Sequence, residues 1–395
     1  MQKDEALKIV QDVLDPCSLD QFFDTIVGKN YMAILGDQGN DRHMLLGDDP
    51  KQAILSAYDR FPQNLTSHIH TPTVAPPSPR TASSPDDFQS LINEYHQKDY
   101  TIRIPDVTDI SPRLSLFTRA LEMIVDNPVG VVVFWSADEA KAPVHYDEVD
   151  VLIIQIKGTK KWYISDEPSP LPNAWKSVGE AEPTLGKYST YDVAPGDLMY
   201  LPRGTVHTVH STDESIHLAI GFIPVTVRDA LTSVIDHLSD LDKPFREALG
   251  TRADDLSNDR AIEIIMQQVR AGLEKLTDNC KSSSFIEEAL ARRHEKMLLE
   301  LPRLSPTMLQ TPITINSKVR HNPLATSKMM VTPNIIDFVQ PGERTLIHVS
   351  VEQSMQYIKD TPEFRVGDMA GSVGDDIRIA LANKMLSTGF LEVVE

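Results

Sequence analysis

The sequence has few cysteines, no long apolar run and no excess of basic residues. Cys17 and Cys280 are its two cysteines, and their separation matches no zinc or redox motif. They could form one bridge, but we expect two buried or free thiols in a reducing cytoplasm. No apolar run approaches the roughly 18 residues that a membrane span needs, and the amphipathic N-terminus shows no signal peptide. We therefore expect a cytoplasmic protein with no membrane partner.

Acidic residues outnumber basic residues by 57 to 38, which gives a formal net charge of −19. A surface this acidic repels phosphate backbones, so we expect no nucleic-acid partner. The same charge would attract a basic protein or peptide. The length of 395 residues and the ordinary hydrophobic share of 41% predict a globular chain of two or three domains.

Short apolar segments separated by turns occupy residues 130–222. The segments are rich in β-branched and aromatic residues: VVVFW, VDVLIIQI, KKWYI, DLMYL and IHLAIGF. The turns between them include KGTK, DEPSP, APGD and PRG. This pattern predicts a β-sandwich or β-barrel.

Helical patterns flank the strand region on both sides. Before it, we expect short helices in residues 1–60, with Phe22, Phe23 and Ile26 on an apolar face, and helices near 86–99 and 112–127. After it, apolar spacing predicts amphipathic helices over residues 227–241, 259–276 and 284–301. The tail predicts a small α+β module with strands at 345–351 and 390–394 and helices at 363–371 and 375–389.

Residues 71–87 are rich in proline, serine and threonine. Such a stretch cannot form a continuous helix or a central strand, so we expect a long surface loop. It would be either a lid that faces the substrate or a mobile insertion.

The most informative segment is APVHYDEVDVLIIQI, which contains His145 and Asp147. In an extended strand, side chains two positions apart point to the same face, so these two project together. An imidazole and a carboxylate are two of the three ligands of the facial triad that binds non-haem iron. The turn-rich segment PGDLMYLPRGTVH supplies His207 as the third ligand.

Two other histidines compete with His207 for this role. His210 would face the opposite side of an extended segment. His217 begins another apolar strand, where it could belong to the core or lie behind the metal ligands.

Residues 128–223 resemble a JmjC domain of the cupin superfamily and are closest to the ribosomal oxygenase subgroup. The residues that carry the resemblance are His145, Tyr146, Asp147, Asp150, Val151, Gly158, Lys160, Trp162, Pro195, Gly196, Asp197, Pro202, Gly204 and His207. The resemblance implies an α+β protein built on a double-stranded β-helix (cupin or jelly-roll) core. The core and its helical lead-in would occupy residues 1–224, a helical dimerisation region 225–325, and a winged-helix-like module 326–395.

The resemblance also implies Fe(II) and 2-oxoglutarate as cofactors, with His145, Asp147 and His207 as both the metal ligands and the catalytic residues. A basic residue at the position of Lys160 binds the distal carboxylate of 2-oxoglutarate in this family. By strand periodicity, Lys160 shares its face with Trp162, while the neighbouring Lys161 faces the other way.

One departure from the family concerns the strand before His145. Family members often place asparagine and tyrosine there, whereas this chain has Val131, Val132 and Val133. Polar contacts to the cosubstrate are therefore expected to be fewer, or to come from Tyr200 or Ser215; the alternative for Tyr200 is a place in the core.

The function implied is a 2-oxoglutarate-dependent dioxygenase that hydroxylates an unactivated C–H bond and releases succinate and carbon dioxide. We expect its substrate to be a protein or peptide side chain and the protein to be a homodimer. The alternatives are a small molecule or biosynthetic peptide as substrate, demethylation of methyl-lysine, and a non-catalytic metal-binding cupin that acts as an interaction module. Lys160 argues against the last alternative, because a binding scaffold needs no cosubstrate lysine.

The C-terminal module could be mistaken for a DNA-binding domain. Residues 366–386 carry balanced charge rather than a basic stripe, so we expect a structural or protein-binding role.

Overall fold

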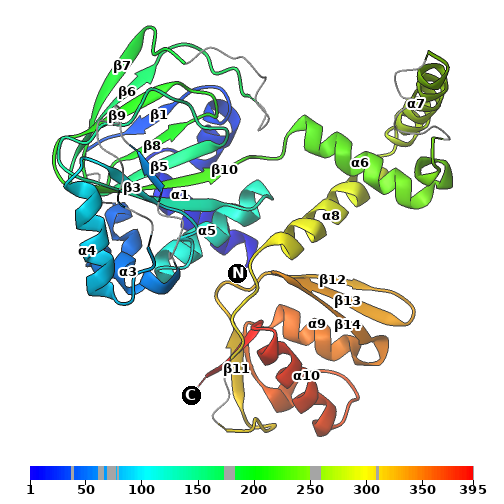
Figure 1. The fold of residues 1–395 in the computed structure, drawn as a ribbon. Coiled ribbons are helices and arrows are strands. Elements are labelled where there is room, and N and C mark those ends of the chain that lie inside the picture. Colours follow the sequence, from blue (N-terminus) through cyan, green and yellow to red (C-terminus); the bar gives the residue numbers. More distant parts are fainter. Residues whose placement is uncertain are drawn as a thin grey trace. The chain divides into compact units, whose positions relative to one another are not determined.

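The computed structural model describes residues 1–36, 40–60, 66–68, 77, 80–172, 183–249, 259–307 and 311–394. The chain divides into two compact units, Met1–Ile223 and Pro224–Glu395, and each is described by itself (Figure 1). Residues 71–76, 78 and 79 of the expected loop at 71–87 lie outside the described residues. No helix among the described residues is long and apolar enough to cross a membrane.

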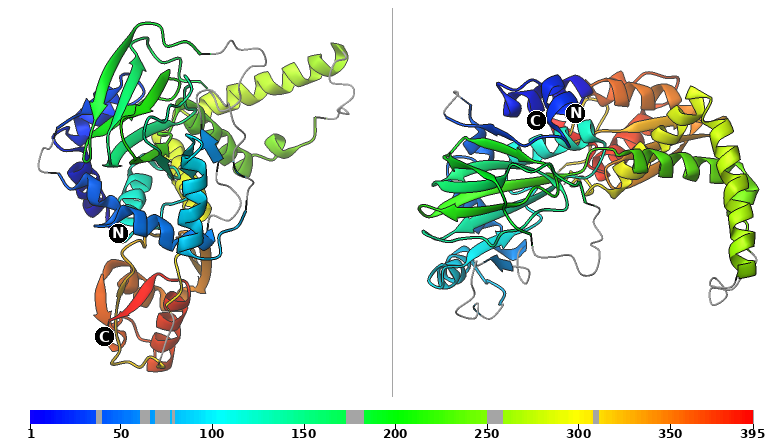
Figure 2. Two further views of the ribbon diagram at one scale, coloured as in Figure 1. Left: turned by 60° about the vertical axis from the view of Figure 1, so that its left-hand side comes forward. Right: turned by 90° about the horizontal axis from the view of Figure 1, so that it is seen from above.

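The first unit is built on two antiparallel sheets, drawn mainly in green in Figure 2. The larger sheet has the order β1 (Met32–Ile34), β8 (Leu198–Leu201), β5 (Asp150–Lys157), β10 (Ser215–Phe222), β4 (Gly130–Ser136), β3 (Thr101–Ile104) and β2 (Thr66–His68). The smaller sheet has the order β7 (Tyr188–Val193), β6 (Lys160–Ser165) and β9 (His207–Ser211). This is the expected double-stranded β-helix, and the α+β fold class is confirmed.

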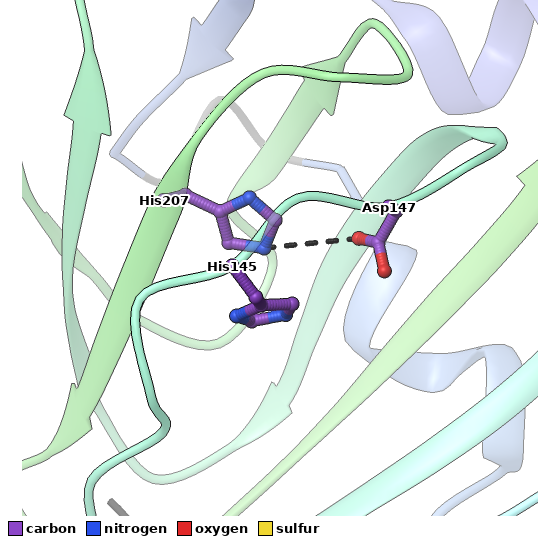
Figure 3. A group of neighbouring side chains, drawn as sticks. All are labelled: His145, Asp147 and His207. Carbon is purple, nitrogen blue, oxygen red and sulfur yellow. Dashed lines mark ion pairs between the residues drawn. The ribbon is translucent and has the colours of Figure 1, made fainter. Parts of the chain in front are cut away.

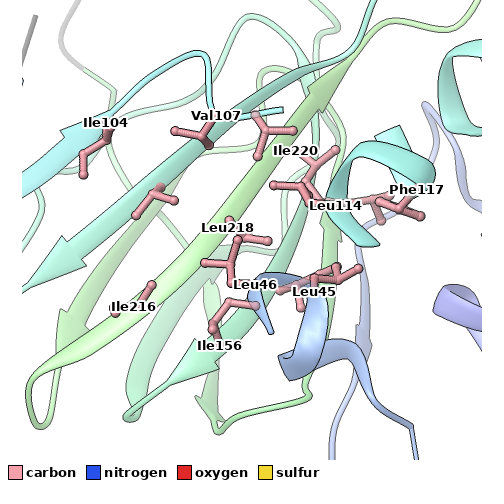
Figure 4. Packing of buried hydrophobic residues seen from close by; sticks show 14 of the residues in the cluster. Leu45, Leu46, Ile104, Val107, Leu114, Phe117, Ile156, Ile216, Leu218 and Ile220 are labelled. Carbon is pink, nitrogen blue, oxygen red and sulfur yellow. The ribbon is translucent and has the colours of Figure 1, made fainter. Parts of the chain in front are cut away.

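Both faces of the larger sheet are buried, and each face belongs to a separate apolar core. Residues 150–156 of β5 are buried without a break, which explains why this strand reads as one apolar run. The core between the sheets contains Val151, Ile153, Trp162, Ile164, Val193, Met199 and Leu201. The outer core contains the residues of alternate parity, and Figure 4 shows Ile156, Ile216, Leu218 and Ile220 on this face.

Helices from the N-terminal part of the chain cover the outer face. They are α1 (Lys3–Leu14), α3 (Pro50–Ser56), α4 (Pro85–His96) and α5 (Pro112–Val125). The helices expected near 86–99 and 112–127 are confirmed as α4 and α5. Ser84 and Ser111 cap them, and the proline that follows each serine occupies the first turn.

Arg42 ties these helices to the barrel from a buried position. Its guanidinium donates to the carbonyl oxygens of Val13 at 2.6 Å, Gly196 at 2.9 Å and Asp15. Val13 lies in the last turn of α1, where unpaired carbonyls favour a cation. Gly196 belongs to the turn before β8, so one side chain joins the helical layer to the sheet.

The second unit begins with the three expected helices, which are confirmed as α6 (Val227–Leu241), α7 (Asp259–Asn279) and α8 (Ser283–Glu300). Helices α6 and α8 pack through Val234, Leu238, Phe285 and Ala289. Cys17 of the first unit and Cys280 of the second are both free thiols.

The C-terminal module has two small sheets and two helices. One sheet has the order β15 (Glu363–Arg365), β11 (Lys318–His321) and β16 (Leu391–Val394). The other has the order β12 (Lys328–Val331), β13 (Ile335–Gln340) and β14 (Glu343–His348), and the helices are α9 (Glu352–Asp360) and α10 (Asp375–Ser387). Because β11 pairs with β15 and β16, the expected boundary at 325/326 cuts through this module.

One expected helix of the module is wrong. Residues 363–371 form strand β15 and a short 3-10 turn, Val366–Asp368. Phe364 and Val366 are both buried, and this two-residue spacing belongs to a strand rather than a helix.

We predict that Arg42→Met destabilises the first unit, because three carbonyl oxygens lose their donor inside the protein. Each buried acceptor without a donor costs on the order of 1–3 kcal/mol of folding free energy. The midpoint temperature at which the first unit unfolds should therefore fall by roughly 5–10 °C. Arg113→Met, on the exposed start of α5, is the matched control and should leave the transition nearly unchanged. Equal melting curves for the two variants would contradict the role given to Arg42.

Candidate metal centre

Backbone pairing holds the segment that leads to Asp147 against β9, through bridges of Lys141 with His210 and of His145 with His207. His145 and His207 exchange backbone hydrogen bonds, with N···O distances of 3.0 and 2.8 Å. The sequence predicted an extended strand here, but residues 142–149 do not form a regular one. Pro143 has no N–H, so it cannot donate the next backbone hydrogen bond to β9. The bridge still sets both imidazoles on one side, with ring centroids 4.4 Å apart.

Among the described residues, His145, Asp147 and His207 are the one group whose ligand atoms converge, all within 4.8 Å of one another (Figure 3). Nε2 of His207 lies 3.7 Å from Oδ2 of Asp147. Ligand atoms that sit about 2.1 Å from one ion are roughly 3–4 Å apart, so small movements suffice to close the site on a metal. Two nitrogens and one oxygen bound on one side of a metal ion leave its remaining coordination positions open for other ligands.

The two imidazoles are held in the form that binds metal. Nδ1 of His145 lies 2.8 Å from the carbonyl oxygen of Pro143, and Nδ1 of His207 lies 2.9 Å from that of Thr205. An Nδ1–H that donates to a carbonyl leaves the ring's lone pair on Nε2. Burial, and after it the neighbouring His145, lowers the pKa of His207, so its ring is neutral near pH 7.

Asp147 stands at the open end of the barrel, with 42% of its side chain exposed. Its carbonyl oxygen accepts the N–H of Gly204 at 2.8 Å. Gly204 has a φ of +85°, and a Cβ there would lie 2.4 Å from Cδ of Pro172. The glycine is therefore required by the tight turn that leads into His207.

Asp150 holds the turn at Arg203 and Gly204 in place through hydrogen bonds. It is fully buried and accepts from the hydroxyl of Tyr200 at 2.6 Å, and from the backbone N and Nη1 of Arg203 at 3.2 and 3.3 Å. This role of Arg203 is not visible in the sequence, because only the folded chain brings the turn to the start of β5.

The structure corrects the hypothesis that Tyr200 contacts a cosubstrate. Tyr200 belongs to the outer core and packs edge-on against Phe22, on the opposite face from the metal ligands. Its hydroxyl is already used by Asp150 and by the N–H of Gly28 at 2.8 Å. Both faces of β8 are buried, so apolar burial alone did not reveal which face Tyr200 occupies.

Lys160 lies inside the barrel and is 2% exposed. Its Nζ donates to Oγ of Ser136 at 2.7 Å, and no carboxylate within the described ranges pairs with it. Burial lowers the pKa of Lys160 to about 7. A buried ammonium without a counter-charge is unfavourable, so this geometry suits an anionic ligand. The neighbouring Lys161 faces outward, as expected, and pairs with Asp192 at 3.3 Å.

Hydroxyl groups surround the end of the Lys160 side chain. Oγ of Ser136 also accepts from Oγ1 of Thr101 at 3.0 Å, and the hydroxyls of Ser211 and Ser215 lie 3.1 Å apart. Ser215 pairs with Ser136 across β10 and β4, so the structure brings Ser215 to this group.

The strand before His145 is more polar inside the barrel than its three valines suggested. Val131 and Val133 belong to the outer core, which leaves Val132, Phe134 and Ser136 on the inner face. Ser136 was missed because it lies just beyond the apolar run, although a spacing of two from Val132 and Phe134 could have identified it.

The competing histidines do not join the ligand group. Nε2 of His210 lies 3.2 Å from Glu139 on the other side of β9. His217 is buried and stacks on Phe134, with ring centroids 4.9 Å apart. Burial, and then the charge of Lys160, lowers the pKa of His217 well below its usual range.

Known proteins share both the domain and the wider sequence. The family model for the JmjC domain matches residues 112–230. Ribosomal oxygenase 2 of Mus musculus is 35% identical over 139 residues, which are 34% of this chain and 29% of that protein. The bifunctional lysine-specific demethylase and histidyl-hydroxylase NO66 of Dictyostelium discoideum is 22% identical over 264 residues, 63% of this chain and 50% of that protein. The chain thus spans half or less of the length of these two relatives.

A solved structure shares the fold over nearly the whole chain. The ribosomal oxygenase YcfD of Escherichia coli, solved with cobalt and succinic acid, aligns with a TM-score of 0.51 at 12% identity, covering 95% of this chain and 98% of that one. The same protein has been solved with cobalt and 2-oxoglutarate, with a TM-score of 0.50 at 13% identity. Residues 112–230 of the chain therefore match the JmjC domain, and part of the chain is similar to ribosomal oxygenases.

Proposed function

We propose that this protein is an Fe(II)- and 2-oxoglutarate-dependent oxygenase that hydroxylates a side chain of a protein or peptide. The observation that carries the proposal is the pairing of two features in one barrel. One is the convergent group of His145, Asp147 and His207, and the other is the buried, uncompensated ammonium of Lys160. A metal site alone would need no such cation.

Each residue has a role that follows from its position. His145 and His207 present imidazole nitrogens and Asp147 a carboxylate, which together would hold the iron from one side. Lys160 would bind the distal carboxylate of 2-oxoglutarate, with Ser136 and Ser215 supplying hydroxyls beside it. With dioxygen as the oxidant, bound iron and 2-oxoglutarate would supply oxidative decarboxylation: one oxygen atom would enter succinate and the other the C–H bond of the substrate, with release of carbon dioxide. The barrel walls keep water from the reacting atoms.

Support for a protein substrate comes from the relatives and from the charge of the chain. Both curated relatives carry names that refer to protein substrates, a ribosome and a histidyl side chain. The net charge of −19 favours a basic partner.

The free thiols of Cys17 and Cys280 fit a cytoplasmic protein.

We further propose that helix α7 makes the protein a homodimer. Ile262, Met266, Val269 and Leu273 are 43–55% exposed and recur at spacings of four, three and four residues. That spacing forms one apolar stripe along a helix, as in helices that pair with a second helix.

We predict that His145→Ala abolishes hydroxylation, because one of three metal ligands is lost. The measurement is mass spectrometry of extract peptides after incubation with the enzyme, iron and 2-oxoglutarate, in search of a gain of about 16 Da. His210→Ala, on the outer side of β9, is the control and should retain the product. A product that survives His145→Ala would contradict the mechanism. A metabolite that gains the oxygen, in place of any peptide, would favour the small-molecule alternative.

We predict that Lys160→Met weakens 2-oxoglutarate binding by roughly 10- to 100-fold, because a charge-assisted contact is lost. Methionine fills similar volume without a buried charge, so the ligand-free melting temperature should not fall. Isothermal titration and thermal melts measure the two quantities. Lys161→Met is the matched control and should change neither.

The pH dependence of binding gives a second test of Lys160. Because burial lowers the pKa of Lys160 to about 7, the ammonium loses its proton as the pH rises above that value. Affinity for the dianion should therefore fall roughly tenfold from pH 7 to 8.5 in the wild type and stay flat in Lys160→Met. A wild-type affinity that rises with pH would contradict the assignment.

We predict that replacing Val269 and Leu273 together by glutamate converts a dimer into a monomer, because the apolar stripe then carries like charges. Light scattering during size-exclusion chromatography measures the mass. Glutamate at Gln267 and Gln268, exposed residues off the stripe, adds the same two negative charges and should leave the dimer intact. A wild-type monomer would favour packing of α7 within its own chain.

A further inference from the structure

Two buried polar side chains inside the barrel have no hydrogen-bond partner among the described residues. They are Trp162 on β6 and His217 on β10, each 3% exposed. The unpartnered atoms are the indole Nε1 of Trp162 and Nδ1 of His217. An unpaired buried donor or acceptor costs on the order of 1–3 kcal/mol, so two in one place call for a partner that a ligand would supply.

These two rings form a continuous wall that starts at the metal ligands. Trp162 stacks on His207, with ring centroids 5.6 Å apart and an interplanar angle of 29°. His217 meets Trp162 edge to face, also at 5.6 Å, and stacks on Phe134. The wall therefore joins a metal ligand on β9 to the inner face of β4.

The other end of the wall reaches Lys160. Trp162 follows Lys160 by two residues, so both point inward from β6. His217 likewise follows Ser215 by two residues on β10, and Ser215 pairs with Ser136, which binds Nζ of Lys160. A ligand that spans the metal ligands and the ammonium thus passes along both rings.

We propose that Trp162 and His217 hydrogen bond the carboxylate or keto oxygens of the 2-oxo dicarboxylic acid, Trp162 at the end near the metal ligands and His217 at the end near Lys160, and so orient it. This inference rests on the proposed function. The indole N–H can only donate, and a neutral imidazole keeps one N–H to donate, so both suit carboxylate or keto oxygens. They act here as binding and positioning residues.

Gln155 does not belong to this pair. Its Oε1 is also buried and without a partner, and Gln155 is the cross-strand neighbour of His217. An amide oxygen only accepts, and a carboxylate has no hydrogen to give. A water molecule, which can donate a hydrogen bond, is the partner that Gln155 requires.

The test is calorimetric titration of 2-oxoglutarate into the full chain loaded with Mn(II), which measures binding without turnover. Trp162→Phe keeps an aromatic ring against His207 and removes the N–H. We expect its Kd to rise roughly tenfold, as for loss of one hydrogen bond to a charged group. The ligand-free melting temperature should stay equal or rise, because an unpaired buried donor has been removed.

His217→Phe is the second variant, since it keeps the stack on Phe134 and removes both nitrogens; it should weaken binding in the same way. Tyr163→Phe, on the outward face of β6, is the matched control and should bind as the wild type does. Wild-type affinity in both Trp162→Phe and His217→Phe would overturn the inference and leave the rings a packing role. Weaker binding together with a lower ligand-free melting temperature would also overturn it, since the loss would then be structural. If the wild type itself does not bind, the proposed function fails, which is a different result.

Discussion

The metal centre depends on one short piece of backbone pairing. His145 and His207 exchange both of their N–H···O bonds, and residues paired in this way keep their side chains on the same face. A slip of one residue would turn one imidazole away from the other. The turn at Gly204 protects this register, because its N–H binds the carbonyl of Asp147 while Asp150 holds Arg203 beside it. Ligand geometry is thus set by the main chain before any metal arrives.

The inside of the barrel is organised around polar groups that the protein does not satisfy by itself. Lys160 has a hydroxyl partner but no counter-charge, and two ring nitrogens nearby have no partner among the described residues. Such groups reduce the stability of the fold, and the apolar burial on both faces of the larger sheet offsets that cost. A binding site for a polar ligand would contain such a cluster of polar groups whose hydrogen bonds the protein itself leaves unmade.

How much could be predicted from the sequence differs between the site and its surroundings. His145 and Asp147 were recognisable from their spacing of two residues, and His207 from the turn-rich segment PGDLMYLPRGTVH that it ends. The faces of strands were harder to assign, since a strand buried on both sides shows no alternation, and Tyr200 was consequently assigned to the wrong face. Ser136 escaped notice because it follows the apolar run rather than lying within it.

Other features could not have been read from local sequence at all. Strands β1, β3, β7 and β9 are short or carry many polar residues, so they show no apolar run of their own. The contacts of Asp150 with Arg203, and of Arg42 with Gly196, join segments that only the folded chain brings together. The mistaken helix at 363–371 shows the same limit, because pairing with β11 overrode local propensity.

The pairing of β1 with β8 has a consequence for synthesis on the ribosome. Gly28 and Tyr200 are joined by a hydrogen bond although they stand 172 residues apart, and Met32 pairs directly with Tyr200. The nascent N-terminal segment thus waits for its partner until most of the barrel has been translated. During that interval its apolar side chains, Phe22 among them, have no sheet to cover them. The segment that contains Phe22 and Met32 is therefore translated well before β8 but reaches its final contacts only after it, and a chaperone would bind it in that interval.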